Sequence, residues 1–427
     1  MRLGVVPWPW GGGGGIYQYS HSLMLGLEDL GLSPDCLIYT DYLEEATRVY
    51  GHLDVAIRPI EPPPKSKAAS TMGRIVGEGP HRDLWRRTMA RRSRARRPGH
   101  LQSKVVNWKP HLTSMLQEAK VDLMIYAWPS AMCFEARVPY VMAVHDLQHR
   151  LQPHFPEVSA NGEWETREYI LRNGVRYATR IVTDSEVGKQ DVLDYYGSVG
   201  ISEDRVEVLP FVPSPLLRRP TEEKMQATRQ RHKLPQDYLF YPAQFWPHKN
   251  HVNIIEALYR LKLRGTAVPI VFVGEHGHPM MEETWSRVQQ LVRAYELGSQ
   301  VHFLGYVSDD EMSALYEDAR ALVMPTFFGP TNIPVVEAWM FDCPVITSDI
   351  RGIREHTGEA GYLVDPRSVD EIADGIERVT GDLGLRDRLV KAGRERIAHY
   401  GQAEFNQRLE SILEKVEPQV ATEGFPE

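Results

Sequence analysis

The sequence predicts an α/β protein made of two doubly wound domains that face each other across a cleft. Short apolar segments of strand length alternate with amphipathic helical segments along the whole chain, which is typical of parallel sheets covered by helices. A polar stretch near the middle interrupts this alternation, which then restarts. A chain of 427 residues is also longer than a single domain usually is.

The first Rossmann-like domain is expected over residues 1–215 and the second over 235–398. A final helix near 402–418 could pack back on the first domain. The expected strands are 3–6, 36–39, 55–57, 123–126, 140–144, 181–183 and 206–209, then 238–241, 270–273, 301–304, 321–324, 344–347 and 362–364. Residues 210–219 and the polar run 221–232 are interpreted as a linker. Asn250 is expected to cap the next helix.

Composition and charge restrict the class of protein. A net charge of −8 excludes a general nucleic-acid binder. The three cysteines, Cys36, Cys133 and Cys343, are far apart, which indicates a reducing compartment and no zinc site. No apolar run approaches the roughly 18 residues of a membrane span, and no signal-peptide pattern precedes the first strand. We therefore expect a cytoplasmic protein, or one bound peripherally to the inner face of the membrane.

Residues 60–110 depart from the pattern because they are strongly basic. They contain thirteen lysines and arginines against three acidic residues, and most of the arginines lie between Arg82 and Arg97. Such a stretch is either a solvated insertion or a docking patch for an anionic membrane surface or an anionic acceptor. The sequence leaves both interpretations open.

Five glycines, Gly11 to Gly15, follow the first strand and precede a helix that begins near Ile16. Glycines allow the backbone to approach a ligand and to direct N–H groups at it. One alternative is a tight turn without a ligand. Another is a dinucleotide-binding loop with Asp41 as the ribose carboxylate, although the third glycine of that motif is absent.

A polar loop between the strand at 321–324 and the next helix is the most informative segment. The helix has Pro334 in its first turn, where the missing N–H costs nothing. Its N-terminus carries free N–H groups and a partial positive charge, which suit a phosphate. Glu337 lies about one turn into the helix and is placed to bind vicinal hydroxyls. Phosphate and hydroxyl recognition together indicate a nucleotide or a nucleotide-sugar.

Two further residues follow predicted strands at the edge that should face the cleft. Lys249 directly precedes a helix N-terminus, where the dipole is unfavourable for a cation, so an anion is expected beside it. His145 follows the strand at 140–144. Its position favours a functional role over a structural one.

In this order the segments resemble the retaining glycosyltransferases of family 4, whose GT-B fold consists of two Rossmann-like domains. The resemblance covers nearly the whole chain except residues 60–110, and the order of the set makes it specific. The matching segments are Val144 to His149, 182–186, 208–210, Gln244 to Lys249, 301–306 and the loop and helix around Glu337.

The resemblance implies a role for individual positions. Lys249 binds the donor diphosphate, Glu337 holds the ribose, and His145 contacts the donor sugar near the reacting carbon. Gln244 stands where the family often has an arginine, and Gly329 stands where it has a first glutamate. The other implied donor contacts are Gly12, Gly13, Gly14 and Gly15 from the opposite domain, Tyr306 and Val307 at the nucleobase, and Gly329, Thr331, Asn332 and Ile333 in the loop before the helix.

The implied reaction is transfer of a sugar from a nucleoside diphosphate to an acceptor hydroxyl, with retained anomeric configuration. Lys249, Gln244 and helix-end N–H groups would stabilise the departing diphosphate, and domain closure would complete the site. No metal and no other cofactor is implied. The acceptor, whether a glycan, a lipid-linked sugar or a small molecule, is left open, and nucleic acid is not expected as a partner.

Three alternatives remain. A GT-B sugar phosphorylase would use the same phosphate site. A non-catalytic sugar-nucleotide-binding protein would be consistent with the replacements at Gly329 and Gln244. An NAD-dependent enzyme would use the glycine loop instead.

Overall fold

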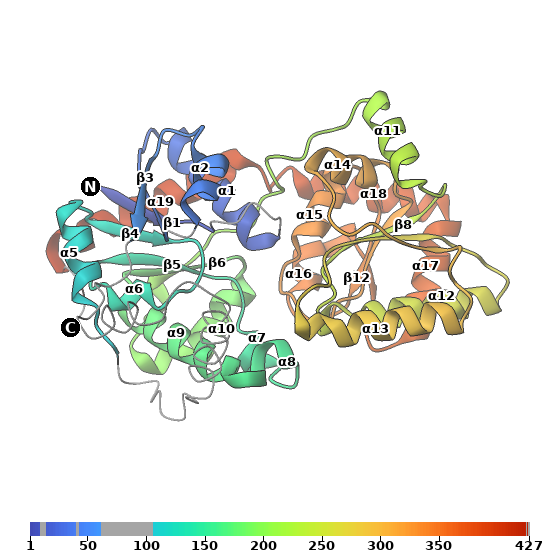
Figure 1. Cartoon of the computed structure of the whole chain (residues 1–427), viewed down its shortest axis with the longest axis horizontal. Helices are drawn as coiled ribbons and strands as arrows, with labels where there is room; N and C mark the ends of the chain where they lie inside the picture. The colour runs from blue at the N-terminus through green and yellow to red at the C-terminus, as the bar shows by residue number, and fades with distance from the viewer. Residues whose placement is uncertain (9–13, 40–41, 61–105, 424, 426–427) are drawn as a thin grey trace, which may run out of the picture.

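The computed structural model describes residues 1–8, 14–39, 42–60, 106–423 and 425. These residues form two parallel sheets covered by helices, arranged as two lobes side by side (Figure 1). The predicted fold class of two doubly wound domains is confirmed. Gly12, Gly13, Asp41 and the segment from Arg82 to Arg97, which carried sequence-based predictions, lie outside the described residues.

The N-terminal sheet has seven parallel strands in the order β3-β2-β1-β4-β5-β6-β7. Two buried apolar clusters lie on its opposite faces, because both faces are covered by helices. The strands are β1 (Leu3–Val6), β2 (Asp35–Tyr39), β3 (Ala56–Ile60), β4 (Leu123–Tyr126), β5 (Tyr140–Val144), β6 (Arg180–Thr183) and β7 (Val206–Val208). The helices are α1 (Gly15–Asp29), α2 (Leu43–Tyr50), α5 (Pro110–Glu118), α6 (Met132–Glu135), α7 (Gln148–Leu151), α8 (Pro156–Ser159), α9 (Glu163–Tyr177) and α10 (Glu186–Tyr196).

The C-terminal sheet has six parallel strands in the order β10-β9-β8-β11-β12-β13 around a single large core. Its strands are β8 (Leu239–Pro242), β9 (Ile270–Val273), β10 (Val301–Phe303), β11 (Ala321–Met324), β12 (Val345–Ser348) and β13 (Tyr362–Val364). Its helices are α11 (Glu222–His232), α12 (His251–Leu263), α13 (Pro279–Ala294), α14 (Asp309–Asp318), α15 (Ile333–Met340), α16 (Ile353–Thr357), α17 (Val369–Gly381) and α18 (Leu383–Ile397). The strand order reverses between β8 and β11, and ligands of such sheets bind beyond that point.

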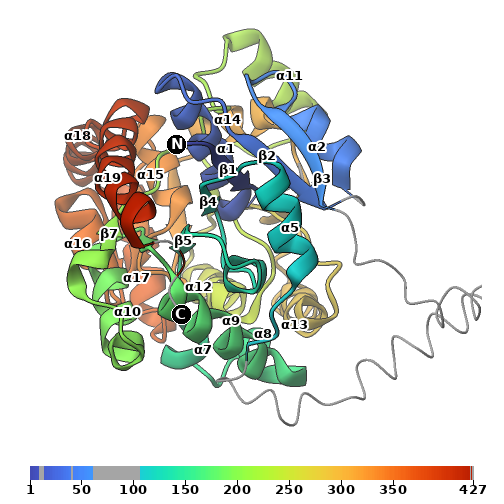
Figure 2. The same ribbon diagram turned by 90° about the vertical axis from the view of Figure 1, so that its left-hand side faces the viewer.

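The last helix, α19 (Gln402–Glu423), returns from the C-terminal lobe to the N-terminal lobe (Figures 1 and 2). Its apolar face is buried against α1, with Phe405 and Leu409 in the same cluster as Leu23 of α1. Gln402 donates a hydrogen bond to the carbonyl oxygen of Ser22 at 3.0 Å. The chain therefore crosses between the lobes twice, which restricts their relative movement.

Two local predictions were wrong. The polar run 221–232 is not a linker, because it forms α11, which packs on α14. This helix is held by ion pairs such as that between Arg229 and Asp318, in which Nε lies 2.7 Å from Oδ2. Because ion pairs hold it in place of a broad apolar face, its sequence lacks the apolar periodicity from which a helix is usually predicted. Asn250 does not cap α12 with its side chain. It adopts a left-handed backbone conformation, and its amide donates to the carbonyl oxygens of Pro325 and Pro366 instead.

Candidate active site

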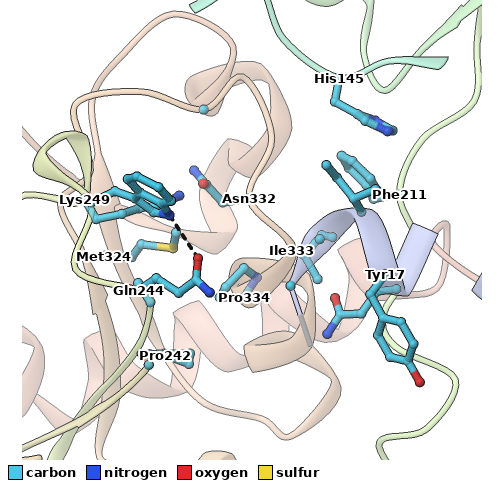
Figure 3. Close-up of a pocket in the computed structure, with 18 of the residues that line it drawn as sticks. Tyr17, His145, Phe211, Pro242, Gln244, Lys249, Met324, Asn332, Ile333 and Pro334 are labelled. Atoms are coloured by element: carbon cyan, nitrogen blue, oxygen red, sulfur yellow. Dashed lines mark hydrogen bonds between the residues drawn. The ribbon is translucent and has the colours of Figure 1, made fainter. Parts of the chain in front are cut away.

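A cavity of about 560 Å³ lies between the two lobes, at the carboxyl ends of both sets of strands. It is lined from one side by the start of α1 and the end of β5, and from the other by the loops that follow β8 and β11. Figure 3 shows these side chains converging, with Lys249 and Gln244 on one side and His145 and Phe211 on the other. All the predicted site residues that the structure describes line this one cavity.

Glu337 lies on α15 with only 3% of its surface exposed. Its Oε2 accepts a hydrogen bond from the Tyr316 hydroxyl at 2.7 Å, and its Oε1 accepts one from Nε2 of Gln18 at 2.9 Å. Burial raises the pKa of this carboxyl to about 7, although both hydrogen bonds act to lower it. Glu337 is therefore a fixed acceptor at the base of the cavity, and near neutral pH it exists in both protonation states.

Lys249 ends a short turn of 3₁₀ helix, Pro247–Lys249, after β8. Burial lowers the pKa of its ammonium to about 8, although Asp146 and Glu157 act in the opposite direction. Among the described residues, no side chain forms an ion pair or hydrogen bond with this ammonium. A half-buried cation without a protein partner, beside a cavity, is a favourable site for a bound anion.

Gln244 is exposed at the rim, and its Oε1 accepts a hydrogen bond from Nε1 of Trp246 at 2.9 Å (Figure 3). Because the carbonyl oxygen of the amide is engaged, its NH₂ group remains to donate toward the cavity. Gln244 can thus supply a neutral hydrogen bond beside the positive charge of Lys249.

His145 projects from the end of β5 toward the cavity. Its Nε2 lies 2.8 Å from the carbonyl oxygen of Ala127, and because a carbonyl only accepts, Nε2 must carry the proton. The ring stacks on Phe211 and meets the edge of Tyr19. Burial lowers the pKa of the imidazole, so the ring is neutral and its Nδ1 can accept a hydrogen bond.

The start of α1 reaches toward the start of α15, so two helix N-termini border the same cavity. Gly14 has a φ of 96°, and a Cβ on Gly15 would lie 3.1 Å from Cδ1 of Ile333. Glycine at these positions therefore permits the close approach. Helix N-termini favour negative charge, which suits a phosphate bound between them.

The loop between β11 and α15 supplies the other predicted donor contacts. The Thr331 hydroxyl donates to Oδ2 of Asp184 in the opposite lobe. Asn332 is buried and faces the cavity, and Gly329 beside it has a φ of 134°. Tyr306, with 61% of its surface exposed, and the buried Val307 lie at the end of the cavity near β9 and β10.

Sequence reasoning missed the polar side chains that join the two lobes. Gln18 bonds Glu337, Asp184 bonds Thr331, Asp191 pairs with Arg351, and the Glu157 carboxylate accepts from both the backbone N–H and Nδ1 of His248. The local sequence around each of these residues contains no pattern that predicts a contact with the other lobe. A polar residue just after a predicted strand end, as at Asp184, was the available signal.

In the part of the chain that the structure describes, no group of three or more His, Cys, Asp or Glu side chains is arranged to hold a metal ion.

None of the described helices is both long and apolar enough to cross a lipid bilayer.

Comparison with known proteins is consistent with this geometry. Residues 223–396 match the family model described as glycosyl transferases group 1. The chain is 25% identical to an O-antigen chain mannosyltransferase B of Escherichia coli, over 56% of the chain and 61% of that relative. It is 22% identical to an alpha-D-kanosaminyltransferase of Streptomyces kanamyceticus, over 60% and 64% respectively. The alignments thus span less than two thirds of each of these relatives.

Solved structures match over nearly the full chain. Anabaena Alr3699/HepE, crystallised with UDP-glucose, superposes with a TM-score of 0.67 at 16% identity, covering 97% of this chain and 99% of the other. A glycosyltransferase from Rickettsia africae superposes with a TM-score of 0.66 over 97% and 98%. The chain therefore has the GT-B fold of glycosyltransferases, and its C-terminal domain matches the group 1 glycosyltransferase family.

Proposed function

We propose that the protein is a retaining glycosyltransferase of family 4. It would transfer a sugar from a nucleoside-diphosphate sugar to an acceptor hydroxyl without an essential metal. The observation that carries this proposal is a shared cavity in which three features meet. They are the Lys249 ammonium, which has no ion-pair partner among the described residues, the buried Glu337 carboxylate, and the N-termini of α1 and α15. These groups fit a diphosphate and the vicinal hydroxyls of a ribose.

In this reaction the bond between the anomeric carbon and the diphosphate breaks while a bond to the acceptor oxygen forms. Lys249, the Gln244 amide and the helix-end N–H groups stabilise the negative charge that develops on the departing diphosphate. Neutral His145 accepts a hydrogen bond from the donor sugar through Nδ1. The acceptor hydroxyl attacks on the same face as the leaving group, which retains the anomeric configuration, and its proton passes to the departing phosphate oxygen.

Relatives named as mannosyltransferases and a neighbour crystallised with UDP-glucose make a hexose the expected transferred group. The nucleobase is tested by a thermal-shift screen of wild type and Glu337→Ala against UDP, GDP, dTDP, ADP and CMP. A ligand at ~100 times its dissociation constant stabilises the folded state by roughly 2.7 kcal/mol. One diphosphate should raise the midpoint of wild type, and the shift should be smaller in Glu337→Ala.

The retaining mechanism, the independence from metal and the transfer activity are each tested by a separate experiment. Proton NMR of the first product should show the anomeric configuration of the donor, and an inverted product would refute the retaining mechanism. Activity should persist in excess EDTA. Binding of a diphosphate without transfer or donor hydrolysis would favour a non-catalytic binding protein instead.

We also propose that the basic segment from Arg82 to Arg97 binds an anionic membrane surface on the cytoplasmic side, where a lipid-linked acceptor would be found. Replacing Arg91, Arg92, Arg94, Arg96 and Arg97 by Ser should abolish salt-sensitive binding to anionic liposomes. If the wild-type protein shows no such binding, the membrane proposal fails.

A further inference from the structure

Asn332 occupies the position before α15 but does not act as its cap. An asparagine at this position usually accepts a hydrogen bond from a backbone N–H in the first turn. Here the side chain forms no such bond. Pro334 has no N–H, and the Val335 N–H donates to the backbone oxygen of Asn332 at 3.0 Å. The amide of Asn332 is therefore not used by the helix that it precedes.

The same amide is buried without a partner. Only 5% of the Asn332 surface is exposed, and its Nδ2 has no hydrogen-bond acceptor among the described residues. Burying an amide N–H without an acceptor is unfavourable, so such groups in native proteins require a reason. A ligand in the adjoining cavity, which Asn332 lines, would supply the acceptor.

Gly329 gives this amide its room. A Cβ added to Gly329 would lie 2.7 Å from Oδ1 of Asn332 and 3.1 Å from its Nδ2, so a side chain at 329 would displace the amide. The φ of 134° at Gly329 also disfavours other residues. The two positions are thus coupled, because the Asn332 amide can occupy its observed position only while residue 329 has no side chain.

The position of Asn332 relative to the other site groups identifies what it would contact. In the view of Figure 3, its side chain lies between Lys249 on the C-terminal lobe and His145 on the N-terminal lobe. The adjacent Thr331 hydroxyl is already engaged by Asp184. A sugar joined to a diphosphate at Lys249 would extend from Lys249 toward His145, and so past Asn332.

We propose that Asn332 selects the transferred sugar by donating a hydrogen bond from Nδ2 to a hydroxyl oxygen of an uncharged hexose. This inference rests on the proposed function. An uncharged sugar is favoured over a hexuronate because, once the diphosphate is paired with Lys249, the remaining cavity wall is mainly acidic. Six carboxylates line it, and besides Lys249 the basic side chains among the described lining residues are Arg167 and the imidazoles of His145 and His248; the carboxylates are those of Asp146, Glu157, Asp184, Glu275, Asp309 and Glu337.

The test separates recognition of the sugar from recognition of the nucleotide. Wild type, Asn332→Ala and Asn332→Asp are compared by calorimetry for binding of the nucleoside diphosphate alone, and by initial rates for its hexose and hexuronate conjugates. Diphosphate affinity should change by less than ~3-fold in Asn332→Ala, whereas kcat/KM for the hexose donor should fall ~10-fold or more. Asn332→Asp, which keeps the shape but loses the donor, should lose activity as well.

A second pair of variants controls for misfolding. Gly329→Ala should reduce kcat/KM in the wild-type background, because the new methyl group displaces the amide. It should have little further effect on kcat/KM in the Asn332→Ala background, and this non-additivity identifies the coupled pair. Midpoints of thermal unfolding report any loss of folding separately.

The outcomes are distinguishable. Equal loss of affinity for the diphosphate and for the hexose conjugate would make Asn332 a structural residue of the loop and overturn the inference alone. Unchanged kcat/KM for the hexose donor in Asn332→Ala would also overturn it. Failure of wild type to bind any nucleoside diphosphate would instead refute the proposed function, and the inference with it.

Discussion

Nε2 of Gln18 donates a hydrogen bond to Oε1 of Glu337 across the two lobes, over a distance of 2.9 Å. Gln18 lies on the helix that follows the glycine run, and Glu337 lies on the helix assigned to the ribose. The contact therefore links the two walls of the cavity directly. It couples the closure of the lobes to the carboxylate on which the proposed donor site depends.

Gln18→Ala should weaken the closed arrangement while leaving the C-terminal lobe intact. We expect diphosphate affinity to change by less than ~3-fold and kcat to fall by ~10-fold or more, because a hydrogen bond to a charged group contributes roughly 1.5–3 kcal/mol. Gln18→Glu should reduce kcat further through like-charge repulsion. The exposed Gln230 on α11 provides a control, since Gln230→Ala should behave as wild type. A larger effect on diphosphate affinity than on kcat would contradict this coupling.

Lys249 should set the alkaline limit of donor binding. Burial places the pKa of its ammonium at about 8, so in the free protein the charge is lost as the pH rises through that value. Diphosphate affinity should fall between pH 7 and pH 9, and Lys249→Arg should remove this dependence because arginine stays protonated. Lys249→Ala should weaken binding by roughly 10- to 100-fold. Calorimetry across this pH range, with exposed Lys391→Ala as the control, measures both effects.

Glu337 should set the acidic limit of donor binding. Its carboxyl, with a pKa of about 7, accepts hydroxyl hydrogen bonds best when ionised, so diphosphate affinity should decline as the pH falls below 7. Glu337→Gln should bind more weakly, by about 10-fold, and should show no such decline. Exposed Glu283→Gln on α13 is the matched control. An acid limb that persists in Glu337→Gln would assign the titration to another group.

Asp184 should make the folded protein less stable as the pH rises. Burial raises the pKa of this carboxyl from 3.8 to about 7, although the hydrogen bond from Thr331 lowers it. Between these values the folded protein binds a proton that the unfolded chain releases, so the free energy of unfolding falls with increasing pH. Asp184→Asn should therefore gain a few degrees in Tm over wild type at pH 8 and nothing at pH 4, a difference that exposed Asp194→Asn should not show.

The sequence predicted the fold, which the structure confirms, and it predicted a donor site at the carboxyl ends of the strands. Every predicted strand was observed, within one residue at its start and within three residues at its end. A buried parallel strand is a short apolar run, and that signal is local. We predicted site residues in the loop before α15, at Lys249 after β8 and at His145 after β5, because each follows the carboxyl end of a strand, where parallel sheets bind ligands. In the structure they line one cavity.

Which polar groups have a partner among the described residues depends on how distant parts of the chain meet in the fold. Gln18 and Glu337 are 319 positions apart, and Asp184 and Thr331 are 147 apart, so no local pattern joins them. The same holds for Asn332, whose residue type predicts a helix cap but whose amide faces the cavity because Gly329 leaves it room. The residue types alone define charge and hydrogen-bond capacity, whereas burial and hydrogen-bond partners arise only when the lobes meet. Burial shifts the pKa of Lys249, Glu337 and Asp184 toward neutrality.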